Sequence, residues 1–396
     1  MRIVIVTDQY PPMVGGVATV THHLSTDLAA RGHQVWVVAP SEDRHNERQL
    51  EAQVRIYRYS SFEWPAYEGQ RIALLPIKGL HQLFKKIAPD VVHIHSPLVL
   101  GNLALLLAHA LHIVVVATNH FMPINISRTL SGDSVLGRSF SKMAYSYLVS
   151  FYRRCEFVTA PTFTALNLLR KHGLRTPGEV VSNGINLARF RPGPRDEELR
   201  RAFGLPEDRP LALDLTRLMG EKRVDILLEA LVQVEEPLHL IIGGTGPDAD
   251  ELQALSARLG IQDRVTFLGF VSDEHLVALY QLADFFVMPS VAELQSLATL
   301  EAMACGRPVV AADAGALPEL VRPGQNGVLF RPDDSAHLAM QLRAMLNQRQ
   351  GWPQMGEWSV RIAANHDRLA VLEQWEHLYS SLVIPQKSCF AAGAGR

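Results

Sequence analysis

Two glutamates eight residues apart, Glu293 and Glu301, lie in the segment MPSVAELQSLATLEAMACGRPVVA, residues 288–311. Its pattern predicts a strand, a loop, a helix that starts at Glu293 and contains Glu301, and a second strand. Eight helical residues rise about 12 Å and turn about 80° past two full turns. Carboxylates at this spacing are too far apart to share one proton or one small metal ion, but they suit the two ends of an extended ligand. A glutamate in a first helical turn also complements the helix dipole, so Glu293 alone is open to either interpretation.

Cationic side chains follow the strand predicted at 211–217. Arg217, Lys222 and Arg223 precede the apolar helix that begins at Val224. Arginine would bind a diphosphate through a fork of donors and lysine through a point charge. A solvated charged turn would have the same composition.

Two glycine-containing loops also follow predicted strands. Gly15-Gly16, in the loop DQYPPMVGGV, would let backbone N–H groups approach a phosphate or sugar, although glycine pairs are also common in tight turns. The sequence GGTGP at 243–247 lacks the third glycine of a dinucleotide fingerprint and the Gly-Lys-Ser/Thr of a Walker loop. It indicates only a nucleotide-facing turn.

Short apolar, β-branched runs recur along the chain with helical patterns between them. They fall at 3–7, 35–39, 91–95, 113–118, 157–160 and 180–182, and again at 211–216, 238–243, 265–268, 285–288 and 309–312. This alternation predicts an α/β protein with two Rossmann-like doubly wound parallel-sheet domains that face a cleft. We expect the functional residues in the strand-to-helix loops, because ligands of open α/β sheets bind at the carboxyl ends of the strands.

The domain boundaries follow from breaks in this pattern. The helix and strand signals stop together around Pro192-Gly193-Pro194, which predicts a first domain at 1–188 and a second at 189–360. A helix at 361–384 would return to the first domain, and the tail 385–396 would be frayed. The apolar stretch 98–118 is long enough to cross a bilayer, but Asn102, His109 and His112 interrupt it. It predicts a buried helix followed by a strand.

Composition and charge narrow the class of protein. Of the 396 residues, 47% are hydrophobic and 20% charged, which is typical of a globular protein. A net charge of −2 argues against nucleic-acid binding. Three widely separated cysteines and a short N-terminal apolar run predict a cytoplasmic protein.

The charge is unevenly distributed. Residues 1–190 carry 19 Lys and Arg against 12 Asp and Glu, whereas residues 191–396 carry 19 against 28. The cationic half could face an anionic membrane. Within it, the segment 138–154 (RSFSKMAYSYLVSFYRR) has the composition of an interfacial helix, and it would equally suit a core-facing helix with a solvated rim.

The segment around the two glutamates resembles a known signature. Glu-x7-Glu followed by Ala-Met-Ala-Cys-Gly-Arg-Pro-Val-Val-Ala is similar to that of retaining glycosyltransferase family 4, whose fold is GT-B. The resemblance covers nearly the whole chain. The other matching motifs, in the family's order, are Gly15-Gly16, Thr118-Asn119-His120-Phe121, Val181-Ser182-Asn183-Gly184-Ile185-Asn186, Thr216-Arg217-Leu218 with Glu221-Lys222, Gly244-Thr245-Gly246-Pro247 and Gly315-Ala316-Leu317-Pro318-Glu319.

The resemblance implies a role for each matching residue. Arg217 and Lys222 would hold the diphosphate of a nucleotide-sugar donor, Glu293 would contact the hydroxyls of the transferred sugar, and His120 would lie near that sugar. These four form the expected catalytic set. Glu301 would hold the ribose, the base would lie near Phe270 and Val271, and the Gly15-Gly16 loop would close over phosphate and acceptor. The expected donor-binding set is Gly15, Gly16, Gly244, Phe270, Val271, Gln295, Ser296, Leu297 and Glu301.

The family also implies a reaction. Transfer would proceed with retention by front-face attack, and the leaving phosphate would take the acceptor proton. Arg217 and Lys222 would stabilise that phosphate, so we expect neither a metal nor a cofactor; the nucleotide sugar is a co-substrate. His93 and His95 alternate at a strand end, and we expect them to be core or cleft-lining residues rather than metal ligands.

Two departures from the family pattern bear on the acceptor. Gln295 and Ser296 stand where the family commonly has Phe-Gly, and Arg223 replaces a common glycine. Glu-Leu-Gln-Ser is closer to the Glu-Thr-Gln-Gly of the diacylglycerol glucosyltransferase branch. A membrane lipid such as diacylglycerol is therefore the expected acceptor, with the protein peripheral on the inner face of the membrane.

Three alternatives remain open. The acceptor of the transferase could be a soluble saccharide or a small metabolite. An epimerase of sugar nucleotides on the same fold would convert the donor without an acceptor. A non-catalytic nucleotide-sugar binding protein is disfavoured by the intact glutamate pair and by Arg217 with Lys222.

Overall fold

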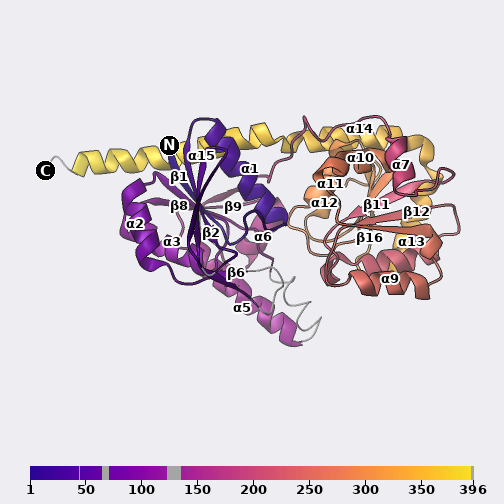
Figure 1. The fold of residues 1–396 in the computed structure, drawn as a ribbon, viewed down its shortest axis with the longest axis horizontal. Helices are drawn as coiled ribbons and strands as arrows, with labels where there is room; N and C mark the ends of the chain where they lie inside the picture. Colours follow the sequence, from indigo (N-terminus) through magenta and orange to yellow (C-terminus); the bar gives the residue numbers. More distant parts are fainter. Residues whose placement is uncertain (44, 65–70, 123–134, 394–396) are drawn as a thin grey trace. The chain divides into compact units, whose positions relative to one another are not determined.

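The chain forms two compact units. The computed structural model describes residues 1–43, 45–64, 71–122 and 135–393 (Figure 1). The first unit comprises the described parts of Met1–Pro123, Ser139–Asn183 and Leu369–Arg396, and the second is built on Gly184–Arg368. The change of unit between Asn183 and Gly184 falls five residues before the boundary expected at 188/189, and the C-terminal segment joins the first unit from Leu369 rather than from residue 361.

The first unit is built on an eight-stranded sheet with the order β10-β9-β8-β7-β1-β2-β4-β3. Its strands are β1 (Arg2–Val6), β2 (Gln34–Pro40), β3 (Glu47–Glu51), β4 (Val54–Tyr59), β7 (Val91–Ile94), β8 (Val114–Thr118), β9 (Phe157–Ala160) and β10 (Gly178–Val180). All neighbours are parallel except β3 and β4. A separate pair, β5 (Ser61–Glu63) with β6 (Arg71–Ala73), is antiparallel.

The sequence pattern did not predict the hairpin of β3 and β4. β3 reads ERQLE, and its residues are mostly exposed at the edge of the sheet. A polar edge strand lacks the buried apolar run that identifies the central strands, and its charges discourage pairing with another chain.

Helices cover both faces of the first sheet. They are α1 (Gly16–Ala30), α2 (Ile77–Ile87), α3 (Val99–Ala110), α5 (Val135–Tyr152), α6 (Phe163–Lys171) and α15 (Arg368–Gly393). α3 and β8 together confirm the buried helix and strand expected for residues 98–118.

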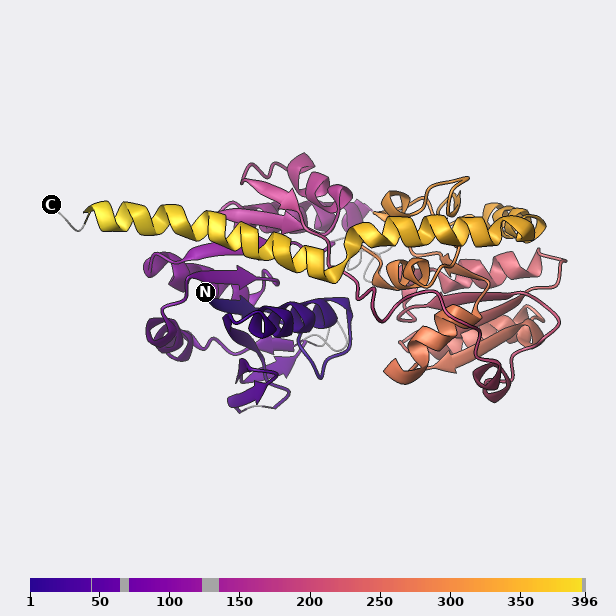
Figure 2. The same cartoon turned by 90° about the horizontal axis from the view of Figure 1, so that it is seen from above.

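The last helix, α15, packs on the first unit, where Figure 2 shows it running along the sheet. Its residues Leu372, Trp375 and Tyr379 share one apolar core with alternate residues of the central strands, such as Ile3 and Val37. Polar contacts add to this core, because the side chains of Arg31 and His33 contact Glu373 and Glu376 of the helix. The helix that ends the described chain is therefore part of the first unit's core.

The second unit contains a six-stranded sheet with the order β13-β12-β11-β14-β15-β16, all parallel. Its strands are β11 (Leu211–Leu215), β12 (His239–Gly243), β13 (Val265–Gly269), β14 (Phe285–Met288), β15 (Val309–Ala312) and β16 (Gly327–Phe330). The strand order reverses between β11 and β14. Such a switch point is the usual ligand-binding position of a doubly wound sheet.

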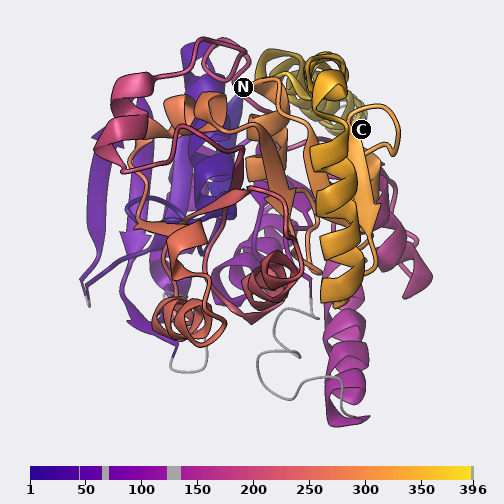
Figure 3. The same cartoon turned by 90° about the vertical axis from the view of Figure 1, so that its right-hand side faces the viewer.

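Helices also lie on both sides of the second sheet (Figures 1 and 3). They are α7 (Glu197–Ala202), η1 (Gly220–Lys222), α8 (Val224–Val232), α9 (Ala249–Arg258), η2 (Gln262–Arg264), α10 (Asp273–Leu282), α11 (Leu297–Ala304), α12 (Leu317–Leu320), α13 (Ser335–Asn347), η3 (Arg349–Gly351), α14 (Trp352–Ala363) and η4 (Ala364–His366). The two doubly wound units agree with the predicted fold class.

Candidate active site

In the second unit, two loops meet at the switch point between β11 and β14. η1 follows β11, and residues 289–296 follow β14. The carbonyl of Glu221 in η1 accepts hydrogen bonds from the Val291 N–H at 3.1 Å and the Ser290 hydroxyl at 3.3 Å. These bonds fix the two loops to each other and so define the relative positions of their side chains.

An ion pair joins the same two loops. The Lys222 Nζ donates to Glu293 Oε1 at 2.6 Å, and the two side chains are only 18% and 11% exposed. Burial by itself lowers the pKa of Lys222, but the Glu293 carboxylate, with smaller contributions from Glu221 and Asp214, more than offsets this effect, so the net pKa is raised. Lys222 is therefore held as a cation in a site largely shielded from water.

A third carboxyl group, Asp214 of β11, is buried close enough to interact electrostatically with the Lys222–Glu293 pair. Its side chain is fully buried, and neither of its oxygens has a hydrogen-bond partner among the described residues. Burial raises the pKa of Asp214 to about 8, with Lys222 lowering it and Glu293 raising it. Sequence analysis missed this residue, although a single acid inside the apolar strand LALDL was a usable signal.

The cations expected near the diphosphate do not share one environment. Arg217 is exposed, and it acts electrostatically on the neighbouring carboxyl of Glu221. Arg223 instead makes a two-armed contact with Asp225, at 3.1 and 3.0 Å, and contacts Asp333. Two carboxylates thus already neutralise Arg223.

The backbone of Arg223 explains why the family commonly has glycine at this position. Arg223 lies in the left-handed region, with φ 54° and ψ 37°, which glycine adopts without strain. The contacts to the two carboxylates hold the arginine in this conformation. Arg223 therefore has a structural role in this turn.

Helix α11 begins later than the sequence predicted. The Ser296 hydroxyl accepts a hydrogen bond from the Thr299 N–H at 3.2 Å and caps the helix, whose first residue is Leu297. Glu293 thus lies in the preceding loop, so the helix-dipole interpretation and the helical spacing of 12 Å to Glu301 are both wrong. Ser296 is buried and Gln295 lies 3.4 Å from His366 Nδ1. Their expected contacts with a donor, and that of Leu297, stay predictions.

Glu301 is held inside α11 by a tyrosine that sequence analysis did not identify. The Tyr280 hydroxyl, on α10, donates to Glu301 Oε2 at 2.7 Å. Burial raises the pKa of Glu301 to about 7, and the Tyr280 bond lowers it. The bond fixes one oxygen of the carboxylate that the family resemblance assigns to the ribose.

The loops after β12 and β13 complete this end of the second sheet. A Cβ on Gly244 would lie 1.8 Å from the Thr216 carbonyl oxygen, so the fold itself requires glycine there. Phe270, after β13, is 67% exposed, whereas the neighbouring Val271 is partly buried. An exposed aromatic ring is available for stacking, and the expected donor contacts of Gly244, Phe270 and Val271 stay predictions.

In the first unit, the Gly15-Gly16 loop leads directly into α1. Helix α1 has no side-chain cap, and its first turn carries no acidic residue. Gly15 has an extended backbone, and a Cβ there would only meet Gln9 at 3.9 Å, an ordinary contact. Packing among the described residues therefore does not require this glycine, and the expected approach of Gly15 and Gly16 to a ligand stays a prediction.

His120 follows β8 in the same unit. Its Nε2 lies 2.9 Å from His95 Nδ1, and the two rings are stacked with centroids 5.2 Å apart. Burial lowers the pKa of His120 to about 4, so the ring is neutral at neutral pH. His93 and His95 are buried and hydrogen-bonded, as expected of core histidines.

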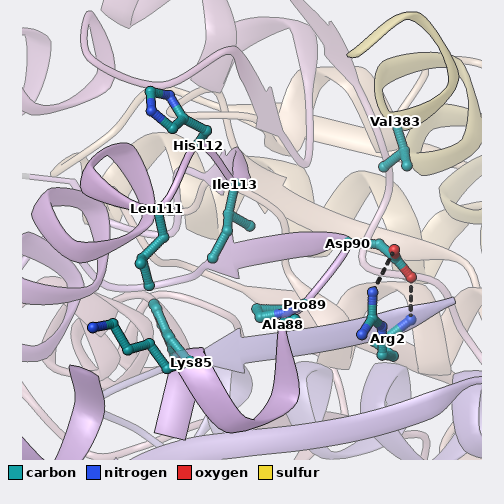
Figure 4. A pocket seen from close by; sticks show the side chains of 10 residues that line it. Arg2, Lys85, Ala88, Pro89, Asp90, Leu111, His112, Ile113 and Val383 are labelled. Atoms are coloured by element: carbon teal, nitrogen blue, oxygen red, sulfur yellow. Dashed lines mark hydrogen bonds and ion pairs between the residues drawn. The ribbon is translucent and has the colours of Figure 1, made fainter. Parts of the chain in front are cut away.

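The first unit also has a cavity of about 380 Å³ at the opposite end of its sheet (Figure 4). Arg2, which begins β1, pairs inside it with Asp90, which precedes β7; Leu111, His112 and Val383 line other walls. Because these are the amino ends of the strands, this cavity is distinct from the edge that carries His120.

Two properties of the described residues complete the description of the site. They contain no cluster of three or more His, Cys, Asp or Glu side chains that could hold a metal ion. None of their helices is both long and apolar enough to span a membrane.

Two doubly wound units in one chain, with charged side chains at the switch point of the second, define the GT-B class of glycosyltransferases. A family model described as "Glycosyltransferase Family 4" matches residues 14–189, and one described as "Glycosyl transferases group 1" matches residues 195–359.

Relatives extend this match over most of the chain. Alpha-monoglucosyldiacylglycerol synthase of Streptococcus pneumoniae is 30% identical over 83% of this chain and 75% of that protein. GDP-mannose-dependent alpha-mannosyltransferase of Mycolicibacterium smegmatis is also 30% identical, over 84% and 85%. The crystal structure of HepE from Anabaena in complex with UDP-glucose superimposes with a TM-score of 0.78 and 22% identity, covering 96% of this chain and all of that one. The chain belongs to glycosyltransferase family 4 and is a glycosyltransferase with the GT-B fold.

Proposed function

We propose that the protein transfers a hexose from a nucleotide-diphosphate sugar to an acceptor hydroxyl, with retention of configuration. The observation that carries this proposal is the Lys222–Glu293 ion pair at the switch point of the second sheet. It combines a held cation, suited to a leaving phosphate, with a carboxylate suited to sugar hydroxyls. Both residues belong to the motifs that match the family.

The donor would bind along the carboxyl ends of β11 to β14. Lys222 and the exposed Arg217 would neutralise the diphosphate, and Glu301 would accept hydrogen bonds from the ribose. These cations would supply the positive charge that a metal ion supplies in other transferases, so we propose a metal-independent reaction with the donor as co-substrate. Loss of one such preorganised donor typically costs about 3 kcal/mol of transition-state stabilisation.

The linkages that the relatives' names state support our proposal of retention. Both names describe α-linked products, and GDP-mannose, the donor in one of the names, is itself an α-glycosyl phosphate. In the proposed step, the acceptor oxygen bonds to the anomeric carbon on the face from which the phosphate leaves. The bond from that carbon to the phosphate oxygen breaks, and this oxygen takes the acceptor proton. Glu293 and His120 would orient the sugar rather than act as nucleophile and base.

The acceptor we propose is a membrane lipid, with diacylglycerol as the first candidate. The name of the relative from S. pneumoniae supports a lipid acceptor. A surface of the first unit supports it independently: Leu74, Leu75 and Ile77 are 52%, 69% and 52% exposed just before and at the start of α2. α2 reads IKGLHQLFKKI, with exposed lysines and no acidic residue. Exposed apolar side chains beside a basic helix suit an anionic membrane surface, which would make the protein peripheral.

The segment 138–154 lends this proposal little support. From Tyr145 onward its large apolar side chains are buried except for Tyr147, with Leu148, Val149, Phe151 and Tyr152 all under 4% exposed. Within α5, Met143 and Tyr147 are the large apolar side chains exposed among the described residues. This favours the interpretation of a core-facing helix with a solvated rim.

Transfer is tested by incubating the protein with a panel of nucleotide sugars and vesicles that contain diacylglycerol and an anionic lipid. UDP-glucose and GDP-mannose are the first donors to try, because the neighbour HepE binds one and a relative's name includes the other. Mass spectrometry of the lipid extract should show a hexosyl-lipid that is absent with Lys222→Met. Turnover that persists in the presence of EDTA would support metal independence.

The proposed membrane-binding surface of the first unit is tested by replacing its exposed apolar residues without altering the charge of the protein. Leu75→Ser combined with Ile77→Ser should weaken binding to anionic vesicles, measured by sedimentation, by roughly a hundredfold, since burying each of the two aliphatic side chains contributes about 1.5 kcal/mol. The matched control is Leu369→Ser, an exposed leucine at 61% on α15. Equal loss of vesicle binding in the control, or none in the double variant, would remove this support for a lipid acceptor.

A soluble acceptor is the second candidate. D-inositol 3-phosphate glycosyltransferase of M. smegmatis is 40% identical over 174 residues, 43% of this chain. Product formation from a soluble acceptor without vesicles would favour this candidate. An epimerase would instead alter the donor with no acceptor present, which NMR of the donor alone would detect.

A further inference from the structure

A chain of hydrogen bonds links His120 to the C-terminal helix. His120 Nε2 contacts His95 Nδ1 at 2.9 Å, and His95 Nε2 contacts His93 Nδ1 at 3.2 Å. The same His93 Nδ1 lies 2.7 Å from the hydroxyl of Tyr379 on α15. On the other side of its ring, His93 Nε2 contacts the Thr118 hydroxyl at 2.7 Å, and Thr118 contacts the Thr159 hydroxyl at 2.7 Å.

Every member of this chain behind His120 is shielded from water. Tyr379, His93 and Thr159 are fully buried, and His95 and Thr118 are 2% exposed. Burial lowers the pKa of His93 and His95 well below its usual value and that of His120 to about 4. Each ring is therefore neutral and carries one N–H, on either Nδ1 or Nε2.

The tautomers of the three rings depend on one another. A neutral ring that donates from one nitrogen accepts at the other, so fixing the hydrogen at His93 fixes it at His95 and His120. In the first order, the Tyr379 hydroxyl at 2.7 Å and His95 Nε2–H at 3.2 Å share the single lone pair of His93 Nδ1, and His120 Nε2 donates to His95 Nδ1. In the second order, His93 Nδ1 donates to His95 Nε2, His95 Nδ1 donates to His120 Nε2, and His120 carries its hydrogen on Nδ1.

Tyr379 distinguishes between these two orders. Among the described residues, the Tyr379 hydroxyl contacts no hydrogen-bonding group except His93 Nδ1. The second order would leave its buried hydroxyl hydrogen without an acceptor. The first order instead leaves the Thr159 hydroxyl hydrogen without an acceptor. A phenol, with a pKa near 10, is the stronger donor and gains more from its bond to an imidazole nitrogen.

We propose that Tyr379 is a positioning residue that keeps the hydrogen of His120 on Nε2, so that His120 Nδ1 is a hydrogen-bond acceptor. This inference rests on the proposed function in one respect: the group that donates to Nδ1 would be a hydroxyl of the transferred sugar. Tyr379 itself touches no substrate. It acts through His93 and His95, although it lies 286 positions after His93 in the sequence.

Removing the Tyr379 hydroxyl should reverse the whole chain. In Tyr379→Phe, the second order has no buried hydrogen without an acceptor, because Thr159 donates to Thr118 and Thr118 donates to His93 Nε2. The first order would still leave the Thr159 hydroxyl hydrogen without an acceptor. The variant should therefore move the His120 hydrogen to Nδ1 and present a donor where the wild type presents an acceptor.

The test is nitrogen-15 NMR of the full-length protein with labelled histidine rings, which reports which nitrogen carries the hydrogen. His120→Gln assigns the His120 signals. We expect Nε2–H at His120 in the wild type and in the matched control Tyr145→Phe, whose ring stacks on His172 elsewhere in the first unit. We expect Nδ1–H in Tyr379→Phe. An Nδ1–H at His120 in the wild type overturns the proposal even if the variant does not fold, and so does a folded Tyr379→Phe with an unchanged tautomer.

The consequence for catalysis has a separate readout. Tyr379→Phe should lower the rate of transfer by roughly tenfold, the effect of about one lost hydrogen bond in the transition state, while the control keeps the wild-type rate. The NMR measurement needs neither donor nor acceptor. A correct tautomer without transfer activity would thus refute the proposed function alone, whereas transfer activity with the wrong tautomer would refute this inference alone.

Discussion

Removing Lys222 should destabilise the second unit as well as abolish transfer. Lys222→Met deletes the cation that lies 2.6 Å from Glu293 and leaves that carboxylate mostly buried near Asp214. At an effective dielectric constant of about 20, two unit charges at this distance attract by about 6 kcal/mol. Desolvation offsets part of this attraction, and removal of one partner of a buried pair typically costs about 3 to 5 kcal/mol. We expect about 3 kcal/mol, since neither side chain is fully buried.

The assay is a double-mutant cycle followed by thermal unfolding. For a unit of this size, a loss of 3 kcal/mol corresponds to a decrease in Tm of roughly 6 to 12 °C. Lys222→Met combined with Glu293→Gln should recover most of this stability, because no charge is then left unpaired. All three variants should lack transfer activity. The coupling energy between the two changes should be about 2 kcal/mol or more.

A matched control comes from the exposed pair of Arg361 and Glu357 on α14. These side chains are 64% and 70% exposed and 3.8 Å apart, so their cycle should give a coupling below about 0.5 kcal/mol. An equally small coupling for Lys222 and Glu293 would refute the view that the pair is a preorganised, water-shielded unit. Full activity of Lys222→Met would refute its proposed role at the diphosphate.

Two further predictions concern stability. Asp214→Asn should raise Tm by an amount that grows as the pH rises from about 4 to about 8. In this range the carboxyl of the folded wild type, with its pKa raised to about 8, stays neutral while that of the unfolded chain ionises. The free energy of unfolding of the wild type thereby falls by up to about 5 kcal/mol, a loss that the asparagine variant avoids. Differential scanning fluorimetry across this pH range should show no such trend for the control Asp250→Asn, whose side chain is exposed. A Tm difference between Asp214→Asn and the wild type that does not change with pH would contradict the raised pKa of Asp214. Gly244→Ala, whose Cβ would lie 1.8 Å from a carbonyl oxygen at φ 128°, should cost about 3 kcal/mol or prevent folding. Gly220→Ala, with nothing within 4 Å, should be nearly neutral, so similar Tm values for the two alanine variants would argue against the close contact.

Much of the architecture was predictable from local sequence. Central strands of a parallel sheet are buried on both faces, so β1, β8 and β14 appear as continuous apolar runs. The polar strand β3 was missed because an edge strand has no such run. The start of α11 was misplaced because the capping serine, Ser296, lies three residues beyond the first plausible start.

The site was predictable as a set of residues, but its organisation was not. The order of the family motifs along the chain identified Lys222 and Glu293 as site residues, because each motif is recognised by its residue types and their spacing. Sequence could not show that Arg223 contacts two carboxylates while Lys222 contacts Glu293, because that choice depends on where separate loops meet.

The amino-acid sequence by itself determined two parallel-sheet units and the loops that carry their charged groups, since burial and helix periodicity are local properties of the chain. Only the tertiary structure decided which of these groups are paired and which protons they hold. Asp214 owes its raised pKa mainly to the exclusion of water, whereas Tyr280 and Tyr379 owe their contacts to partners on other elements. Hydrogen bonds and desolvation of this kind depend on distances in space, which no pattern along the chain records.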